Sequence, residues 1–112
     1  MSSTGPIRQR LPNRRGCISF ALVCEGLAYS ATLSRFPDGR LAEIFLTNHK
    51  AGSAADSAAK DSAVVASIAL QHGVPVDVIR RALLRNSQGK ASSPLGVALD
   101  LIEAPALERR SR

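Results

Sequence analysis

The fold is decided by the stretch Glu43-Ile-Phe-Leu-Thr-Asn-His-Lys-Ala-Gly-Ser53. A run typical of a β-strand stops here at a short polar turn that contains Gly52. A long Ala-rich helix is expected to begin at Ser53, which with Asp56 resembles a capping box. The first N–H groups of a helix lack intrahelical partners, so a strand end, a glycine turn and a helix start together predict an anion site.

Three strands are expected before this turn. Apolar side chains alternate with small or polar ones over residues 17–24, 27–36 and 41–47, which is the pattern of half-buried strands. The sequences Glu25-Gly26 and Pro37-Asp38-Gly39 separate these runs, and both favour turns. Connections this short join antiparallel neighbours, so we expect an antiparallel meander.

Helices are expected after the turn, over residues 53–72, 75–86 and 95–103. Gly73 ends the first helix and Pro75 opens the second. The resulting fold class is α+β, with a three-stranded antiparallel meander followed by two or three helices packed on one face. The residues of the first helix that are expected to face the core share a stripe at helical spacing: Ala54, Ala58, Val65, Ile68 and His72.

Length and composition indicate one domain. A chain of 112 residues with 45% apolar content is long enough to bury one core. We expect a flexible basic arm over residues 1–15, a single domain over 16–104 and a basic C-terminal tail over 105–112. No segment has the composition of a signal peptide or of a membrane span, so we expect a cytoplasmic protein with no membrane partner.

The charge balance favours acidic partners. The chain has 15 Lys and Arg against 9 Asp and Glu, a formal net charge of +6. Such an excess is typical of proteins that meet nucleic acid, nucleotides or an acidic protein face, although a basic surface without a dedicated partner has the same composition. The aliphatic residues of the second helix are expected to face the core: Val76, Ile79, Ala82 and Leu83. Its arginines are expected to project outward, and the candidate basic partner patch comprises Arg8, Arg10, Arg14, Arg15, Arg80, Arg81 and Arg85.

The two cysteines, Cys17 and Cys24, are expected to be buried structural thiols. They are an odd number of residues apart, so a regular strand points them to opposite faces, where they cannot form a disulfide. The histidines, His49 and His72, are isolated from other ligand types. The sequence therefore predicts no metal site and no bound cofactor.

Ordered blocks of the sequence resemble the TSCPD domain. They are Gly39-Arg-Leu-Ala-Glu-Ile-Phe-Leu, Lys50-Ala-Gly-Ser, Ala69-Leu-Gln-His-Gly-Val-Pro-Val-Asp-Val-Ile and Ser92-Ser-Pro. That family is found near the C-terminus of adenosylcobalamin-dependent ribonucleotide reductases and as small free-standing proteins. The resemblance extends over residues 17–103 and implies a relation to ribonucleotide reduction, with a reductase subunit as a partner. The Thr-Ser-Cys-Pro-Asp run is absent and no cysteine follows Ser93, so no thiol or metal role is carried over.

The candidate ligand site lies around the turn. A nucleotide-like anion would meet the N–H groups of the helix start and the side chains of His49 and Lys50. Glu43 shares a strand face with Phe45, and is either a solvent-facing residue of the open sheet face or a carboxylate that faces a ligand. The candidate ligand-binding residues are Glu43, Asn48, His49, Lys50, Gly52 and Ser53.

No pattern of a catalytic centre is present, and no catalytic residue is assigned. A ribonucleotide reductase needs a large barrel and several cysteines, so this chain cannot be that enzyme alone. The preferred interpretation is a non-catalytic accessory or binding module for a nucleotide-like anion, a nucleic acid or a reductase-type partner. The alternatives are a small enzyme acting on a phosphorylated metabolite at the turn over residues 50–53, and a structural protein that works as a homodimer.

Overall fold

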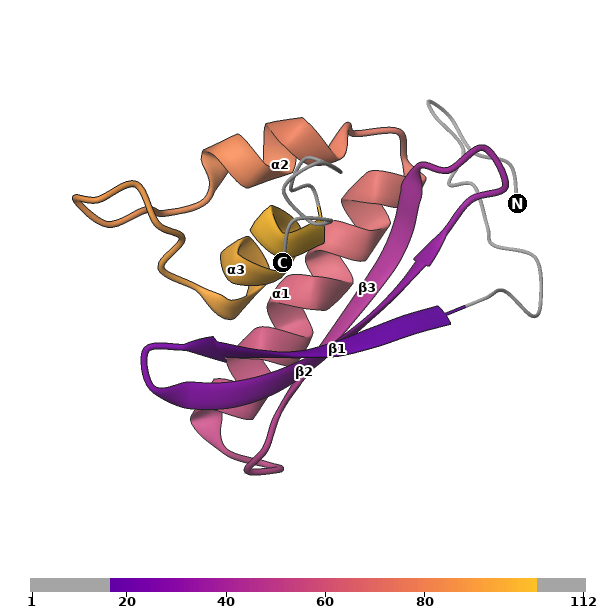
Figure 1. Ribbon diagram of the computed structural model, residues 1–112. Helices are drawn as coiled ribbons and strands as arrows, with labels where there is room; N and C mark the ends of the chain where they lie inside the picture. The colour runs from indigo at the N-terminus through magenta and orange to yellow at the C-terminus, as the bar shows by residue number, and fades with distance from the viewer. Residues whose placement is uncertain (1–16, 103–112) are drawn as a thin grey trace, which may run out of the picture.

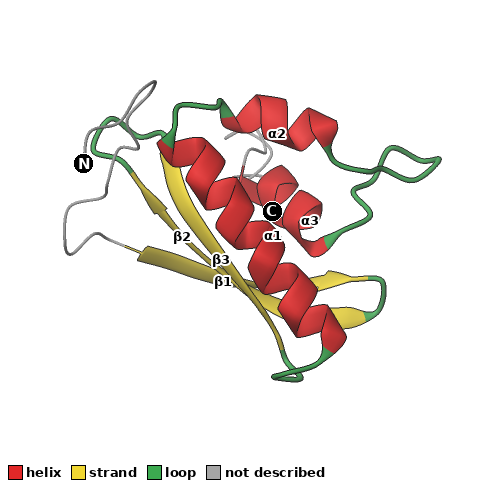
Figure 2. Cartoon of the chain, turned by 180° about the vertical axis from the view of Figure 1, so that it is seen from behind, coloured by secondary structure: helices red, strands yellow, loops and turns green. Residues whose placement is uncertain are grey.

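The structure, a computed structural model, describes residues 17–102. The described elements follow one another in the order β1 (Cys17–Cys24), β2 (Leu27–Arg35), β3 (Leu41–Asn48), α1 (Ala54–Gln71), α2 (Val76–Ala82) and α3 (Pro94–Ile102). The strands form one antiparallel sheet in the order β1-β2-β3 (Figure 1), and the helices lie on one of its faces (Figure 2). The predicted α+β class and the meander are confirmed. The expected arm over 1–15 and tail over 105–112 lie outside the described residues.

Tight turns set the register of the meander. β1 and β2 are joined through Glu25 and Gly26 alone, with φ values of 52° and 77°, which is the geometry that two-residue hairpins require. The turn between β2 and β3 is closed by Phe36, whose N–H donates to the Arg40 carbonyl at 2.8 Å. Both connections therefore place sequence neighbours side by side and leave β1 and β3 as the edges of the sheet.

The core lies between the sheet and the helices. Alternate residues of each strand point to the helices, among them Leu33 and the fully buried Ile44. From the other side, α1 presents small residues such as Ala63, and α3 presents Leu99. Because alanine has a short side chain, α1 can approach β3 closely. This close approach allows side chains of α1 to reach the backbone of β3.

The predicted buried stripe of α1 is wrong. Val65 is 66% exposed and Ile68 is 40% exposed, and the other three predicted residues are also exposed. The helix is rotated so that a mixed set is buried instead: Asp56, Ala59, Ala63, Ala66, Ser67, Leu70 and Gln71. The physical reason is that the polar members of this set have hydrogen-bond partners on β3, and these bonds offset the cost of removing them from water.

The helix boundaries differ from prediction mainly at α2. Ser53 is the N-cap of α1, as expected, and its hydroxyl accepts the N–H of Asp56 at 3.1 Å. α2 ends at Ala82, which is exposed, rather than continuing to residue 86. The chain after α2 forms a turn because the Asn86 side chain accepts backbone N–H groups of the following residues. Within the described residues no helix is long and apolar enough to cross a membrane.

Candidate functional site

A buried carboxylate organises the turn between β3 and α1. The side chain of Asp56 accepts the backbone N–H of Asn48 at 2.9 Å and that of Gly52 at 3.1 Å. It also pairs with the Lys60 ammonium at 2.9 Å, although Asp56 itself is only 2% exposed. These partners stabilise the ionised form, and the two backbone donors contribute most, so the pKa of Asp56 falls to about 2.

Two further side chains close the same turn. The Ser53 hydroxyl donates to the Lys50 carbonyl at 2.7 Å while accepting the N–H of Asp56. The Asn48 carboxamide accepts the N–H of Lys50 at 2.8 Å and donates to the Ala28 carbonyl at 3.4 Å. The turn is therefore held by its own polar side chains, in a geometry that gives backbone donors to a carboxylate of the same chain.

This arrangement bears directly on the predicted anion site. Two of the N–H groups that such a site would use, on Asn48 and Gly52, already donate to Asp56. His49 and Lys50 are exposed at the tip of the turn, where they remain accessible to a ligand. Any external anion would thus rely on these two side chains rather than on the two occupied amides. A phosphorylated metabolite, as expected if the chain were a small enzyme, would depend on the same two side chains.

Glu43 is separated from the other predicted ligand residues. It lies on the face of β3 that carries no helix, together with the half-exposed Phe45. Asn48 ends the same strand five residues later, roughly 16 Å away along β3. The structure therefore groups Asn48, His49, Lys50, Gly52 and Ser53 in one turn and places Glu43 outside it.

Sequence reasoning missed the role of Asp56. The residue was assigned to a capping box, in which its carboxylate would return to the N–H of Ser53. Instead the carboxylate turns toward the end of β3. The sequence does carry a signal for this role. It is an acidic residue in the first turn of an Ala-rich helix that directly follows a glycine turn.

The same face of α1 covers the outer edge of β3. The Ser67 hydroxyl accepts the N–H of Ile44 and donates to its carbonyl, both at 3.0 Å. The Gln71 side chain donates to the Ala42 carbonyl at 3.1 Å. Together with the contact of Asp56 to Asn48, these bonds satisfy backbone groups that face away from β2. An edge strand is thereby closed by side chains of a helix.

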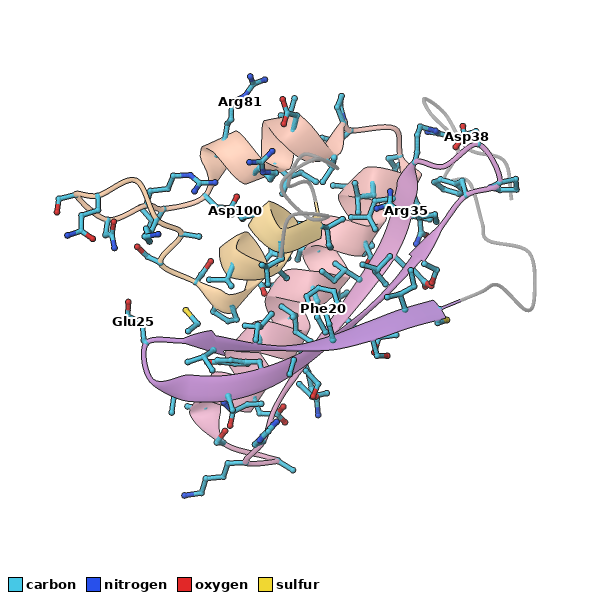
Figure 3. The ribbon with its side chains drawn as sticks, in the orientation of Figure 1. Phe20, Glu25, Arg35, Asp38, Arg81 and Asp100 are labelled. Atoms are coloured by element: carbon cyan, nitrogen blue, oxygen red, sulfur yellow. The ribbon has the colours of Figure 1, made fainter. Side chains whose placement is uncertain are left out.

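The basic patch is divided in the structure. The Asp100 carboxylate of α3 binds the Arg80 guanidinium at 3.1 Å and the Arg85 guanidinium at 2.8 Å. Arg85 is exposed and Arg80 is half-buried, and both side chains are directed to Asp100 rather than extending freely into solvent. Arg81 does project into solvent (Figure 3), where it lies 3.6 Å from Asp77. The remaining members of the patch lie outside the described residues: Arg8, Arg10, Arg14 and Arg15.

The described domain is nearly neutral. Residues 17–102 contain eight basic and seven acidic side chains, so they carry a formal charge of +1. The flanking residues 1–16 and 103–112 contain seven arginines and two glutamates, which is a formal charge of +5. The positive charge that predicts an acidic partner thus belongs mainly to the ends of the sequence.

The cysteines differ in their surroundings. Cys24 is buried beside a cleft of about 460 Å³ that is also lined by Lys90 and Asp100. Burial raises the pKa of the Cys24 thiol, and the neighbouring Glu25 carboxylate raises it further. Cys17 is exposed at the other end of β1, so the prediction of two buried thiols is wrong for it. Neither thiol forms a disulfide, and no group of three metal-ligating side chains occurs among residues 17–102.

The fold and its polar contacts define a small α+β domain in which charged side chains stabilise the turns and the β3 edge of the sheet. The TSCPD domain family matches residues 9–104, and the chain belongs to that family. No solved structure matches it.

Several similar proteins are vitamin B12-dependent ribonucleotide reductases. The protein from Agrobacterium fabrum is 41% identical over 71 residues, which are 62% of this chain and 6% of that protein. The protein from Bradyrhizobium diazoefficiens is 37% identical over 70 residues, again 62% of this chain and 6% of the relative. The protein from Rhodopirellula baltica is 35% identical over 74 residues, or 66% and 7%. The chain therefore corresponds to a short segment of each of these relatives.

Proposed function

We propose that this chain is a non-catalytic accessory module that binds a partner of the ribonucleotide reductase class. The observation that carries the proposal is the family match over residues 9–104, together with relatives in which the similar segment belongs to a B12-dependent ribonucleotide reductase. A domain that is part of a larger enzyme in its relatives has surfaces suited to that enzyme. The domain of this chain would use the same surfaces to bind such a partner.

The use of charge inside the domain supports a binding role. Asp56 accepts hydrogen bonds from the backbone of the turn and pairs with Lys60, and Asp100 pairs with two arginines. The partners of both carboxylates lower their pKa values, so each remains an anion and a hydrogen-bond acceptor at neutral pH. A general base needs a pKa close to the working pH, and neither carboxylate has one.

The test is direct binding between purified proteins. The full-length chain is immobilised, and the B12-dependent ribonucleotide reductase of the same host is passed over it. We expect saturable binding that free chain in solution abolishes. Two variants then locate the contact by placing a lysine at a half-exposed or exposed apolar position: Phe45→Lys on the open sheet face and Val65→Lys on α1. Failure of the two wild-type proteins to bind at any accessible concentration would refute the proposal.

A second candidate is the binding of nucleic acid or nucleotides, and the charge distribution favours it. Seven arginines and only two acidic residues lie outside the nearly neutral described domain. Phosphate binding by such segments falls steeply with salt, because each neutralised phosphate releases condensed counterions. We expect deletion of residues 1–15 to weaken binding to single-stranded DNA and to flatten its salt dependence. Equal affinity of the full-length and shortened chains at every salt concentration would exclude this role for the arm.

Substitution of two lysines tests whether a nucleotide binds at the turn between β3 and α1. Lys50 and Lys90 are both exposed loop residues, but only Lys50 adjoins the start of α1. If a nucleotide binds at the turn, Lys50→Ala weakens binding several-fold, more so at low salt, whereas Lys90→Ala does not. Equal effects of the two substitutions would mean that the turn contributes only general positive charge.

A further inference from the structure

Residues 75–92, which comprise α2 and the loop after it, lie on the outside of the domain beyond α3 (Figure 1), and we call this segment the strap. None of its residues is buried, whereas α1 has seven buried residues and α3 has five. Three aliphatic side chains of the strap are partly covered where they pack on the core: Val76, Ile79 and Leu83. A segment with so few buried apolar contacts has a low local stability.

One carboxylate joins the strap to the rest of the domain. Asp100 of α3 accepts a hydrogen bond from the Arg80 guanidinium at 3.1 Å and two from the Arg85 guanidinium, each at 2.8 Å. Among the described residues no other hydrogen bond or ion pair crosses between the strap and the domain. The remaining bonds of the strap are internal, such as that from the Ser92 N–H to the Leu84 carbonyl. Paired charges of this kind form the stronger class of hydrogen bond, so Asp100 is the main polar attachment of the strap.

Clefts lie at both ends of the strap. Its first part, around Pro75, lines a cleft of about 350 Å³ together with Leu41 and Leu70. Its last part, around Lys90, lines the cleft of about 460 Å³ beside Cys24. Within the part of the chain that the structure describes, the strap is therefore not close-packed against the domain at either end. Its attachment depends on the contacts of its middle part.

We infer that the strap detaches from the domain as a unit while the sheet, α1 and α3 remain folded, and that Asp100 holds it closed. Opening of the strap breaks the bonds of one carboxylate and exposes only partly buried side chains. Opening of the sheet would instead expose fully buried residues such as Ile44. Gly73, with a φ of 97°, ends α1 just before the strap and gives the chain a joint at which it can bend.

Opening changes what the domain presents to a partner. In the closed form Arg80 and Arg85 bind Asp100. In the open form both guanidinium groups are released, together with the apolar side chains on the inner side of α2. The inference goes beyond the proposed function, because it concerns the chain without a partner. A partner that binds the open form better than the closed form would shift the population toward it.

Amide hydrogen exchange of the full-length chain tests the inference. A helix of seven residues is not stable without tertiary contacts, so α2 unfolds when the strap detaches, and the N–H groups of residues 80–82 then exchange. The N–H group of Ala31 lies on the central strand β2 and exchanges only when the sheet opens. In wild type we expect the amides of residues 80–82 to be less protected than that of Ala31 by roughly ten-fold or more. Equal protection would overturn the inference.

A variant outside the strap separates opening of the strap from unfolding of the whole domain. Ser67→Ala removes bonds between α1 and β3 that are intact in both the closed and the open form. It should therefore lower the protection of Ala31 and leave that of residues 80–82 unchanged. If the strap opened only by global unfolding, the protection of both would fall equally, and the inference would be wrong.

The role of Asp100 is tested against a matched ion pair. Asp100→Asn removes the charge that binds two arginines of the strap, and should lower the protection of residues 80–82 by roughly ten-fold or more. Asp38→Asn is the control, because Asp38 pairs with Arg40 in the turn between β2 and β3, outside the strap. It should leave residues 80–82 as protected as in wild type. Equal effects of the two substitutions on these amides would show that Asp100 does not hold the strap closed.

Discussion

Removal of the Ser67 hydroxyl is expected to weaken the attachment of α1 to β3, because two hydrogen bonds between them are lost. The hydroxyl is 3.0 Å from both the backbone nitrogen and the carbonyl oxygen of Ile44, and Ile44 is fully buried. Ser67→Ala therefore leaves one buried donor and one buried acceptor without a partner. Each such group costs about 1–3 kcal/mol, and alanine regains roughly 0.5 kcal/mol through its higher helix propensity. For the two groups together we expect a net loss of about 1.5–5.5 kcal/mol from the free energy of unfolding.

A loss of this size is easily measured in a domain of this length. Total stability is typically about 5–15 kcal/mol, and each kcal/mol shifts Tm by roughly 4–8 °C in a domain of 60–100 residues. Urea unfolding followed by far-UV circular dichroism gives the difference. Ser62→Ala is the matched control, because the Ser62 hydroxyl donates only to the Ala59 carbonyl of its own helix. We expect the control to change stability by less than about 0.5 kcal/mol.

Hydrogen exchange separates this explanation from a general loss of packing. The Ile44 amide should lose protection selectively in Ser67→Ala, whereas the Phe45 amide, which faces β2, should be affected only through global stability. Two results would refute the reasoning: equal losses for Ser67→Ala and Ser62→Ala, or an Ile44 amide that remains as protected as Phe45 in the variant.

Three further predictions follow from the buried carboxylate, a packed glycine and the thiols. Asp56 has a folded-state pKa of about 2 against an ordinary 3.8, so the stability it contributes is present above pH 3.8 and is lost as pH falls toward 2. Asp56→Asn should be less stable than wild type at pH 7, with a difference that shrinks over that window; a constant difference from pH 7 to pH 2 would contradict the assigned pKa. Gly96→Ala would place a methyl group 2.9 Å from the Ala91 Cβ, so thermal unfolding should show a net loss of about 1 kcal/mol after the gain in helix propensity, and unchanged or higher stability would argue against this close contact. Cys17 should react rapidly with a thiol reagent and Cys24 slowly, since the latter is buried with a raised pKa; two equally fast thiols in the native protein would disagree with the structure.

The sheet could be predicted from the sequence because its information is local. Alternation over 17–24, 27–36 and 41–47 fixes which side chains share a face, and a two-residue turn at Glu25 fixes the register of the first hairpin. The start of α1 was equally accessible, because a cap such as Ser53 acts within one helical turn. These features depend on residues within a few positions of one another.

The buried face of α1 could not be predicted in the same way. Alanine occurs on several sides of the helix, so it defines no single stripe, and Val65 and Ile68 biased the choice toward the side that is exposed. Ser67 and Gln71 are polar and were not among the residues expected to face the core. Their burial depends on backbone groups of β3 more than twenty residues away, and that pairing is visible only in the folded chain.

The candidate site shows the same division between local and distant information. The sequence located a turn rich in backbone donors at Gly52 but did not identify the carboxylate of Asp56 as their acceptor. It also counted Arg80 and Arg85 as partner contacts, although each has a nearer partner in Asp100. In both cases a group that was predicted to bind an external partner binds a carboxylate of the same chain instead. Local composition cannot distinguish these outcomes, because both require the same residue types.

The closed edge of β3 restricts how this domain can associate. A strand could be added at β3 only if α1 moved away, which would expose the backbone of Ile44 and break the bonds of Ser67, Gln71 and Asp56 at once. A partner strand that pairs with β3 must therefore displace α1 first. A partner that leaves α1 in place binds elsewhere, and the lysine substitutions at Phe45 on the open sheet face and at Val65 on the exposed side of α1 test two such positions.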